Sequence, residues 1–251
     1  MGLKSFRLGE ADLKSVKRLN KYMPLERALN LLNNKCIWFA NPEEWIDPYE
    51  KRFICATYDK DRAFTWKGRV FCSCFTCNGT SEASWNAYSS ISDCVQISFY
   101  ADALRQLLDD YARKNPKHYV FFDAVEYMQS KDIEKPLKKI RFTPSLLPSV
   151  TYRTMEFKER LLLLKRKAFE YEKEYRAIII KSKRTKEKGI NVPFETIKPL
   201  IASITIGPKT GDDTFKMLKG VLCREYGFSE DQILQSFLYK SRPNPISIKT
   251  K

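Results

Sequence analysis

Apolar and polar residues recur along this chain at helical spacing in some segments and alternate as in a strand in others. Residues 24–33 predict a helix that begins at Pro24 and ends at the Asn33-Asn34 pair. Its apolar positions share one face: Leu25, Ala28, Leu29 and Leu32. Short apolar runs begin near Leu19 before it and at Cys36 after it. The chain is therefore predicted to open as strand, helix, strand.

The same two periods predict most of the remaining elements. Strands are predicted over residues 36–40, 69–77, 94–99, 174–180 and 204–207, and helices from about 82, over 101–113, over 157–171 and over about 212–226. Strands and helices follow one another without regular alternation, which favours an α+β fold over a doubly wound one. We therefore expect a mixed, mainly antiparallel sheet with flanking helices.

The length of the chain allows one large domain or two small ones. Its 251 residues are 43% hydrophobic, which is ample for a core. No stretch resembles a Gly/Ser-rich or Pro-rich linker. We therefore predict a single α+β domain over residues 1–251, with a helical insertion at about 101–170.

Charge adds a preference for polyanions. Lys and Arg total 45 against 30 Asp and Glu, a formal net charge of +15. That excess is larger than solubility requires, and it speeds encounter with nucleic acid. It does not distinguish RNA from DNA or from an anionic membrane surface.

Two absences favour the cytoplasm. No window approaches the ~20 apolar residues of a membrane span, so no membrane association is expected. The seven cysteines are an odd number, and no secretory signal precedes them. Free thiols in a reducing compartment fit this pattern best.

The segment Glu172-Lys-Glu174-Tyr-Arg176 carries the strongest candidate chemistry. On a strand, Glu172, Glu174 and Arg176 share one face. Apolar residues follow, as where a strand starts at the rim of a cleft. Two carboxylates there suit acid–base chemistry or stabilisation of a sugar cation. The alternative is a structural ion pair between Arg176 and Glu174.

Cysteine and histidine offer weaker candidates. Cys72-x-Cys74-x-x-Cys77 invites a zinc site, but the spacing is not that of a zinc knuckle, and buried strand cysteines are the favoured interpretation. No metal is therefore predicted. His118 is the single histidine and has no nucleophile motif beside it, so a surface histidine is expected.

Aromatic residues are concentrated in the first third of the chain. They are Trp38, Phe39, Trp45, Trp66, Trp85 and Tyr88. Most are expected in the core. With the basic charge beside them, some suit stacking against a base or a nicotinamide ring.

An ordered set of motifs resembles a known bacterial family. The set consists of Lys21-Tyr22, the Leu25–Leu32 helix, Ile37-Trp-Phe-Ala-Asn-Pro42, Asp47-Pro48, Cys74-Phe-Thr76, Trp85, Tyr88, Val95–Phe99, Glu172-Lys-Glu-Tyr-Arg176 and Ile204–Gly207. In this order the motifs resemble domain of unknown function 2971, over most of the chain from about Lys21 to Gly207. The family name states no activity.

The layout of the motifs is similar to that of ADP-ribosyltransferases, and this resemblance implies a site. Glu174 would stabilise the oxocarbenium ion formed from NAD, the substrate, and Glu172 would orient or deprotonate the acceptor. Ser73 or Thr76 would position Glu174. The residues implied to hold NAD are Lys21, Tyr22, Ser73, Thr76 and Tyr88.

The function expected from the resemblance and the charge is NAD-dependent ADP-ribosylation of nucleic acid, RNA ahead of DNA. The resemblance to toxin and phage-defence enzymes implies an antitoxin-like partner. Two alternatives stay open. One is a non-catalytic nucleic-acid-binding module in which the glutamates are structural. The other is a metal-dependent nuclease that uses Asp47, Glu50, Glu172 and Glu174.

Overall fold

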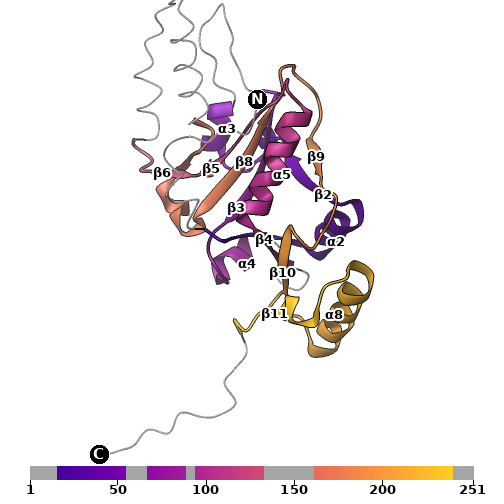
Figure 1. Cartoon of the computed structure of the whole chain (residues 1–251). Coiled ribbons are helices and arrows are strands. Elements are labelled where there is room, and N and C mark those ends of the chain that lie inside the picture. Colours follow the sequence, from indigo (N-terminus) through magenta and orange to yellow (C-terminus); the bar gives the residue numbers. More distant parts are fainter. Residues whose placement is uncertain (1–15, 55–66, 89–93, 133–160, 240–251) are drawn as a thin grey trace, which may run out of the picture.

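A nine-stranded sheet forms the centre of the protein. The computed structural model describes residues 16–54, 67–88, 94–132 and 161–239, coloured in Figure 1. The strands of the large sheet are β1 (Arg18–Pro24), β2 (Cys36–Ala40), β3 (Val70–Thr76), β4 (Cys94–Tyr100), β5 (Tyr119–Ala124), β8 (Glu174–Ile180), β9 (Gly189–Pro193), β10 (Ile201–Ile206) and β11 (Ile233–Gln235). Two short strands, β6 (Glu126–Met128) and β7 (Leu164–Arg166), form a separate parallel pair.

Helices lie around this sheet. The α-helices are α2 (Leu25–Asn34), α3 (Pro48–Ile54), α4 (Glu82–Tyr88), α5 (Ala101–Lys114) and α8 (Asp212–Tyr226), and the 3-10 helices are η1 (Pro42–Glu44), η2 (Lys167–Glu172) and η3 (Glu230–Gln232). Within the large sheet the pairs are antiparallel except for β10 with β11. The predicted α+β fold with a mixed, mainly antiparallel sheet is therefore confirmed.

The sheet forks at β3. One edge of β3 pairs with β8 along its whole length, from Val70↔Ile180 to Thr76↔Glu174. The other edge meets two strands that diverge, β1 through the pair Asn20↔Thr76 and β2 through the pair Ala40↔Cys72. From there β1 continues the sheet with β4, and β2 continues it with β9. Helix α2 connects the two branches.

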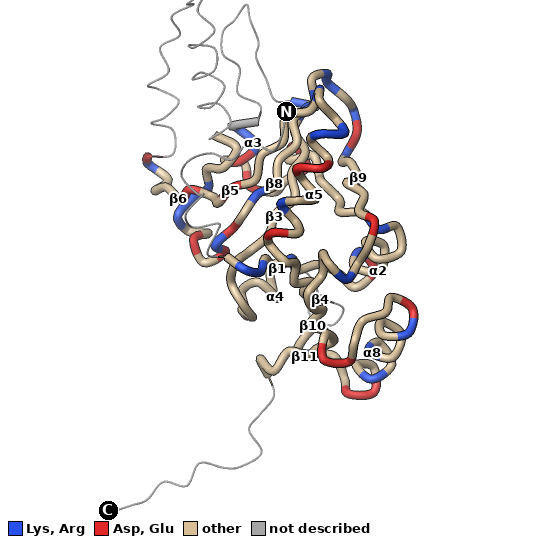
Figure 2. The backbone as a smooth tube through the Cα atoms, viewed as in Figure 1, with Lys and Arg blue, Asp and Glu red and all other residues tan. Residues whose placement is uncertain are grey.

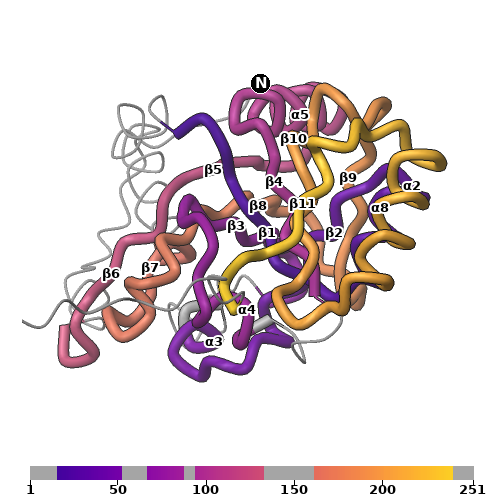
Figure 3. Tube along the Cα trace, turned by 90° about the horizontal axis from the view of Figure 1, so that it is seen from below, coloured from indigo at the N-terminus to yellow at the C-terminus, as the bar shows by residue number. Residues whose placement is uncertain are grey.

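The core lies on both faces of the sheet, as the alternation in β8 shows. Tyr175, Ala177 and Ile179 join the main core with α2 and α5. Ile178 and Ile180 face a second cluster that includes Leu162 and Leu163. Figure 3 shows α2 and α8 at one side of the molecule and β6 and β7 at the other. No described helix is both long and apolar enough to cross a membrane.

The predicted helix over 157–171 is wrong from residue 162 onward, and Leu161 is the one described residue of that range in an α-helix. Residues 164–166 form β7, and η2 follows at once. The physical reason is the leucine run that precedes them: Leu161, Leu162, Leu163 and Leu164 are each at most 5% exposed. Consecutive burial on all sides suits extended chain between two layers better than an amphipathic helix. Residues 133–160, within the predicted insertion at 101–170, lie outside the described residues.

Candidate active site in the fork of the sheet

A cavity of about 720 Å³ opens where the sheet forks. Sites for small organic ligands span roughly 300–1,000 Å³. The walls come from β1, α2, β2, β3, the start of β8 and Asn191 of β9. Five of the residues predicted for the site line this cavity: Lys21, Tyr22, Thr76, Glu172 and Glu174.

Glu174, the first residue of β8, is almost fully buried at 3% exposure. Its Oε1 accepts a hydrogen bond from Arg176 Nε at 2.8 Å, and its Oε2 accepts one from Lys165 Nζ at 2.9 Å. Burial alone would raise the pKa of this carboxyl, but the two cations outweigh burial and lower the pKa of Glu174 to about 2. Glu174 is therefore ionised at neutral pH.

Glu172 reaches the same lysine from a different backbone segment. The prediction that it shares a strand face with Glu174 and Arg176 is wrong, because Glu172 ends η2 and Lys173 has a φ of 41° before β8 begins. The two carboxylates nevertheless converge, since Lys165 Nζ also donates to Glu172 Oε2 at 2.7 Å. Burial raises the pKa of Glu172 in spite of this lysine.

Lys165 joins the two carboxylates from the small β6–β7 sheet. Its side chain is 10% exposed, and Nζ lies 5.1 Å from the ring centre of Phe169. Burial would lower the pKa of Lys165, but the carboxylates of Glu174 and Glu50 raise it. Lys165 was not among the residues predicted for the site. Its position directly after a run of leucines could have indicated it, because a lysine among buried residues needs an anionic partner.

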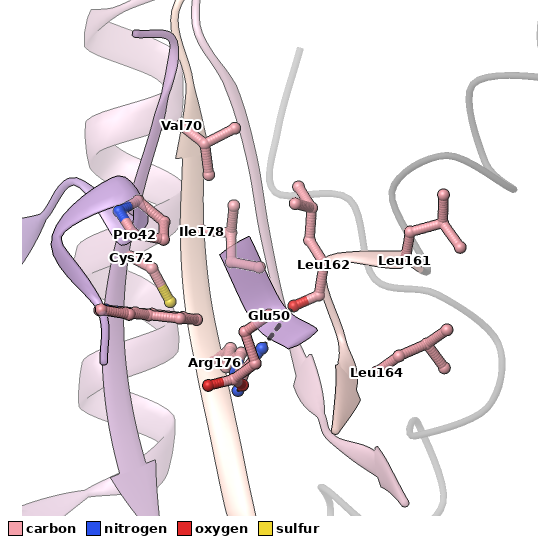
Figure 4. A pocket seen from close by; sticks show the side chains of 10 residues that line it. Pro42, Glu50, Val70, Cys72, Leu161, Leu162, Leu164, Arg176 and Ile178 are labelled. Atoms are coloured by element: carbon pink, nitrogen blue, oxygen red, sulfur yellow. Dashed lines mark hydrogen bonds and ion pairs between the residues drawn. The ribbon is translucent and has the colours of Figure 1, made fainter. Parts of the chain in front are cut away.

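Arg176 does not line the large cavity and lies against Glu50 in a second, small pocket (Figure 4). It donates to Leu162 O at 2.8 Å and pairs with Glu50 of α3. Its guanidinium carbon lies 4.7 Å from the ring centre of Trp45. The space left between these groups is about 10 Å³, at the lower limit for a single water. Arg176 is thus sealed, and its role is to hold Glu174 and Glu50.

The cluster as a whole is anionic. Three carboxylates, from Glu50, Glu172 and Glu174, meet two cations, Lys165 and Arg176, in four ion pairs. One negative charge therefore remains in excess when all five groups are ionised. The two carboxylates that line the cavity present that charge to its interior.

Lys21 and Tyr22 line the cavity from β1. Lys21 Nζ donates to Cys74 O at 2.9 Å, at the point of β3 between the two diverging strands. Burial lowers the pKa of Lys21. The Tyr22 hydroxyl donates to Gly79 O at 3.0 Å and accepts from Gln96 Nε2 at 2.9 Å. Burial raises the pKa of Tyr22 to about 12, so it stays a neutral phenol.

Of the other three residues predicted to bind NAD, Thr76 lines the cavity. Thr76 Oγ1 donates to the Glu172 carbonyl oxygen at 2.5 Å, so it positions the backbone of a carboxylate residue. Ser73 lies on the opposite face of β3, 1% exposed, and does not line the cavity. Positions 73 and 76 point to opposite faces of one strand. The side chain of Tyr88, at the end of α4, lies outside the described residues.

Of the residues considered for metal chemistry, the cysteines are free thiols and the carboxylates Asp47 and Glu50 are held in ion pairs. Cys72 and Cys74 are free thiols with their sulfurs 3.8 Å apart. Asp47 pairs with Arg166 at 3.2 Å, and Glu50 pairs with Arg176. Within the described ranges no group of three or more His, Cys, Asp and Glu side chains is arranged to hold a metal ion. His118 is half-buried against Tyr111 and outside the cavity.

The carboxylate cluster predicts a loss of stability in acid. The pKa of Glu174 is lowered to about 2 in the fold, below its ordinary value of 4.5 in an unfolded chain. Its stabilisation is therefore complete above about pH 4.5 and disappears as the pH falls toward 2, a change of about 3 kcal/mol in the free energy of unfolding. Glu172, whose pKa is raised, acts in the opposite sense.

Denaturant unfolding of the wild type and Glu174→Gln between pH 6 and 2.5 checks this prediction. The stability difference between the two proteins should shrink with acidification, because the variant has no carboxyl to protonate at that position. Parallel curves over the whole range would contradict it.

Comparison with known proteins identifies a family for part of the chain, and the description of that family states no activity. Residues 84–177 match a family model described as "Protein of unknown function (DUF2971)". The match is narrower than the resemblance from Lys21 to Gly207, but it includes Glu172, Glu174 and Arg176. No curated protein and no solved structure matches the chain. The family indicated by the sequence motifs is thus confirmed for residues 84–177, which carry four of the five residues of the carboxylate cluster, all except Glu50.

Proposed function

We propose that this protein is an NAD-dependent ADP-ribosyltransferase that modifies nucleic acid, RNA ahead of DNA. The observation that carries the proposal is the ionised Glu174, held rigidly beside Glu172 at the wall of a cavity of nucleotide size. Breaking the bond between ribose and nicotinamide leaves positive charge on the sugar. A fixed carboxylate in a site of low dielectric stabilises that charge without reorganising.

The fit to NAD rests on two groups of residues that line the cavity, one anionic and one cationic. Glu172 and Glu174 would face the ribose that becomes cationic. Lys21 and Arg27, which also line the cavity, would face the diphosphate, since both offer positive charge to phosphate oxygens. Leu31 and Phe75 supply apolar wall for the rings. Polar groups at a few points of an otherwise apolar pocket are typical of sites for such ligands.

The reaction balances with the residues present. The nicotinamide–ribose bond breaks and its electron pair leaves with the ring, which becomes neutral, so no general acid is needed. An acceptor N–H or O–H attacks the sugar and loses its proton. Glu172 is the base for that proton, because burial brings its pKa nearer to neutral pH than that of Glu174.

Incubation of the purified protein with adenylate-labelled NAD and separate RNA, DNA and protein fractions tests this function. We expect nicotinamide release, label on nucleic acid with RNA ahead of DNA, and no effect of EDTA. Cleavage of nucleic acid that EDTA stops, without nicotinamide release, would favour the nuclease. Tight RNA binding with no NAD consumption would favour the binding module. The resemblance to toxin and phage-defence enzymes also leads us to propose a toxin or phage-defence role, with an antitoxin-like protein as partner. This part of the proposal has no basis in the assay above.

A further inference from the structure

Trp38 is exposed where its neighbours are not. On β2, Ile37 and Phe39 are fully buried in the main core, and the alternate positions Cys36, Trp38 and Ala40 line the cavity. Trp38 keeps 47% of its surface exposed. A tryptophan that lines a cavity and keeps about half of its surface exposed can offer its ring to a ligand, and Tyr and Trp are enriched at interfaces because they combine an apolar ring with a polar group.

The ring of Trp38 is supported from one side. A Cβ atom built on Gly189 of β9 would lie 2.1 Å from Trp38 Cζ2, so the indole rests directly on the glycine backbone. Because β9 covers that side, the exposed surface of the ring belongs to the side that faces away from β9. Asn191, the cross-strand partner of Trp38, lines the same cavity and places an amide beside the ring.

A basic loop leads into β9, the strand that supports this ring. The loop between β8 and β9 is basic: its exposed cations are Lys183, Arg184, Lys186 and Lys188, and its one acidic residue, Glu187, pairs with Lys181. The loop is tied to the end of β2, because Asn41 N donates to Lys188 O at 2.8 Å. Figure 2 shows these basic positions along the stretch that leads into β9. Cations that follow a sugar–phosphate backbone, next to an aromatic ring, form the usual platform for single-stranded nucleic acid.

We propose that Trp38 stacks on an unpaired base of a single-stranded nucleic acid whose phosphates contact the basic loop of residues 181–188. The proposal rests on the proposed function in naming the acceptor, and it places that base in the cavity that Glu172 and Glu174 line. An unpaired base is required, because a base inside a duplex has both faces covered. Asn191, the cross-strand partner of Trp38, offers an amide to the edge of the stacked base.

Binding measured without NAD tests this site separately from catalysis. Fluorescence anisotropy with a labelled single-stranded RNA should show that Trp38→Ala raises the Kd roughly 5- to 150-fold, the range expected for one stacked base. Trp38→Phe, which keeps a ring, should retain most of the affinity. Tyr100→Ala removes an aromatic ring of similar exposure, 39%, away from the cavity, and should bind as the wild type does.

Two further measurements separate stacking from charge and from misfolding. Heparin is a polyanion without bases, so Trp38→Ala should leave its affinity unchanged. Stacking should also quench the fluorescence of Trp38, and Trp38→Phe should remove that quenching, although the other three of the four tryptophans stay in place. These readouts do not depend on NAD turnover.

Two results would overturn the proposal. One is wild-type RNA affinity in Trp38→Ala. The other is a loss of NAD affinity in Trp38→Ala with RNA affinity unchanged, which would assign the ring to the adenine of the dinucleotide. If NAD is never consumed and RNA binding still depends on Trp38, the platform stands and the proposed transferase activity fails.

Discussion

Glu174→Gln is expected to lower the rate of NAD consumption roughly 100- to 1,000-fold, the usual cost of removing one fixed electrostatic group from a transition state. The amide keeps the shape of the side chain and removes its negative charge. Nicotinamide release at saturating NAD measures the effect. Because the charge acts on the transition state, kcat should fall far more than KM rises.

Glu50→Gln is the matched control for that variant. Glu50 and Glu174 both pair with Arg176, and both are buried, at 8% and 3% exposure. Only Glu174 of the two lines the cavity. Glu50→Gln should therefore weaken the same ion-pair network and keep NAD consumption within about tenfold of the wild type. Equal losses of activity in the two variants would show that the cluster acts through stability alone.

Arg176→Met is expected to lower the free energy of unfolding by about 3–5 kcal/mol, because it leaves two buried carboxylates without their shared cation. Arg176 is 2% exposed and contacts Glu174, Glu50 and the Leu162 carbonyl. Methionine fills much of the volume, so the loss reports charge more than cavity formation. Urea unfolding at neutral pH measures it.

Arg113→Met provides the comparison on the surface. Arg113 also pairs with two carboxylates, Asp109 and Asp110, but it is 56% exposed on α5. Water solvates all three groups there, so its loss should change the free energy of unfolding by at most about 1 kcal/mol. If Arg176→Met costs no more than Arg113→Met, the buried network does not stabilise the fold.

Local sequence determined the elements whose pattern repeats within a few residues. The apolar stripe of α2, the helix α5 and the alternation of β8 were predictable, because each depends on the spacing of neighbouring side chains along one backbone. The same alternation places the side chains of Ser73 and Thr76 on opposite faces of β3. What alternation does not reveal is which face of a strand will border a cavity.

The tertiary structure decided how the site is assembled. Glu172 and Glu174 are two residues apart and yet leave different backbone segments, because Lys173 turns the chain between them. Lys165 reaches both from the separate β6–β7 sheet, and the Glu50 side chain that meets Arg176 comes from α3, 126 positions away along the chain. The cavity itself exists because β1 and β2 diverge from β3. None of these contacts has a local spacing to recognise.

The composition by itself determined that the protein is strongly basic, with a formal charge of +15. It did not determine which cations face solvent and which are buried. Lys165 and Arg176 are buried and paired with carboxylates. Lys183 and Arg184, in contrast, are exposed in the loop that precedes β9. The physical reason is desolvation: a charge can leave water only where the complete fold brings an opposite charge within hydrogen-bond distance.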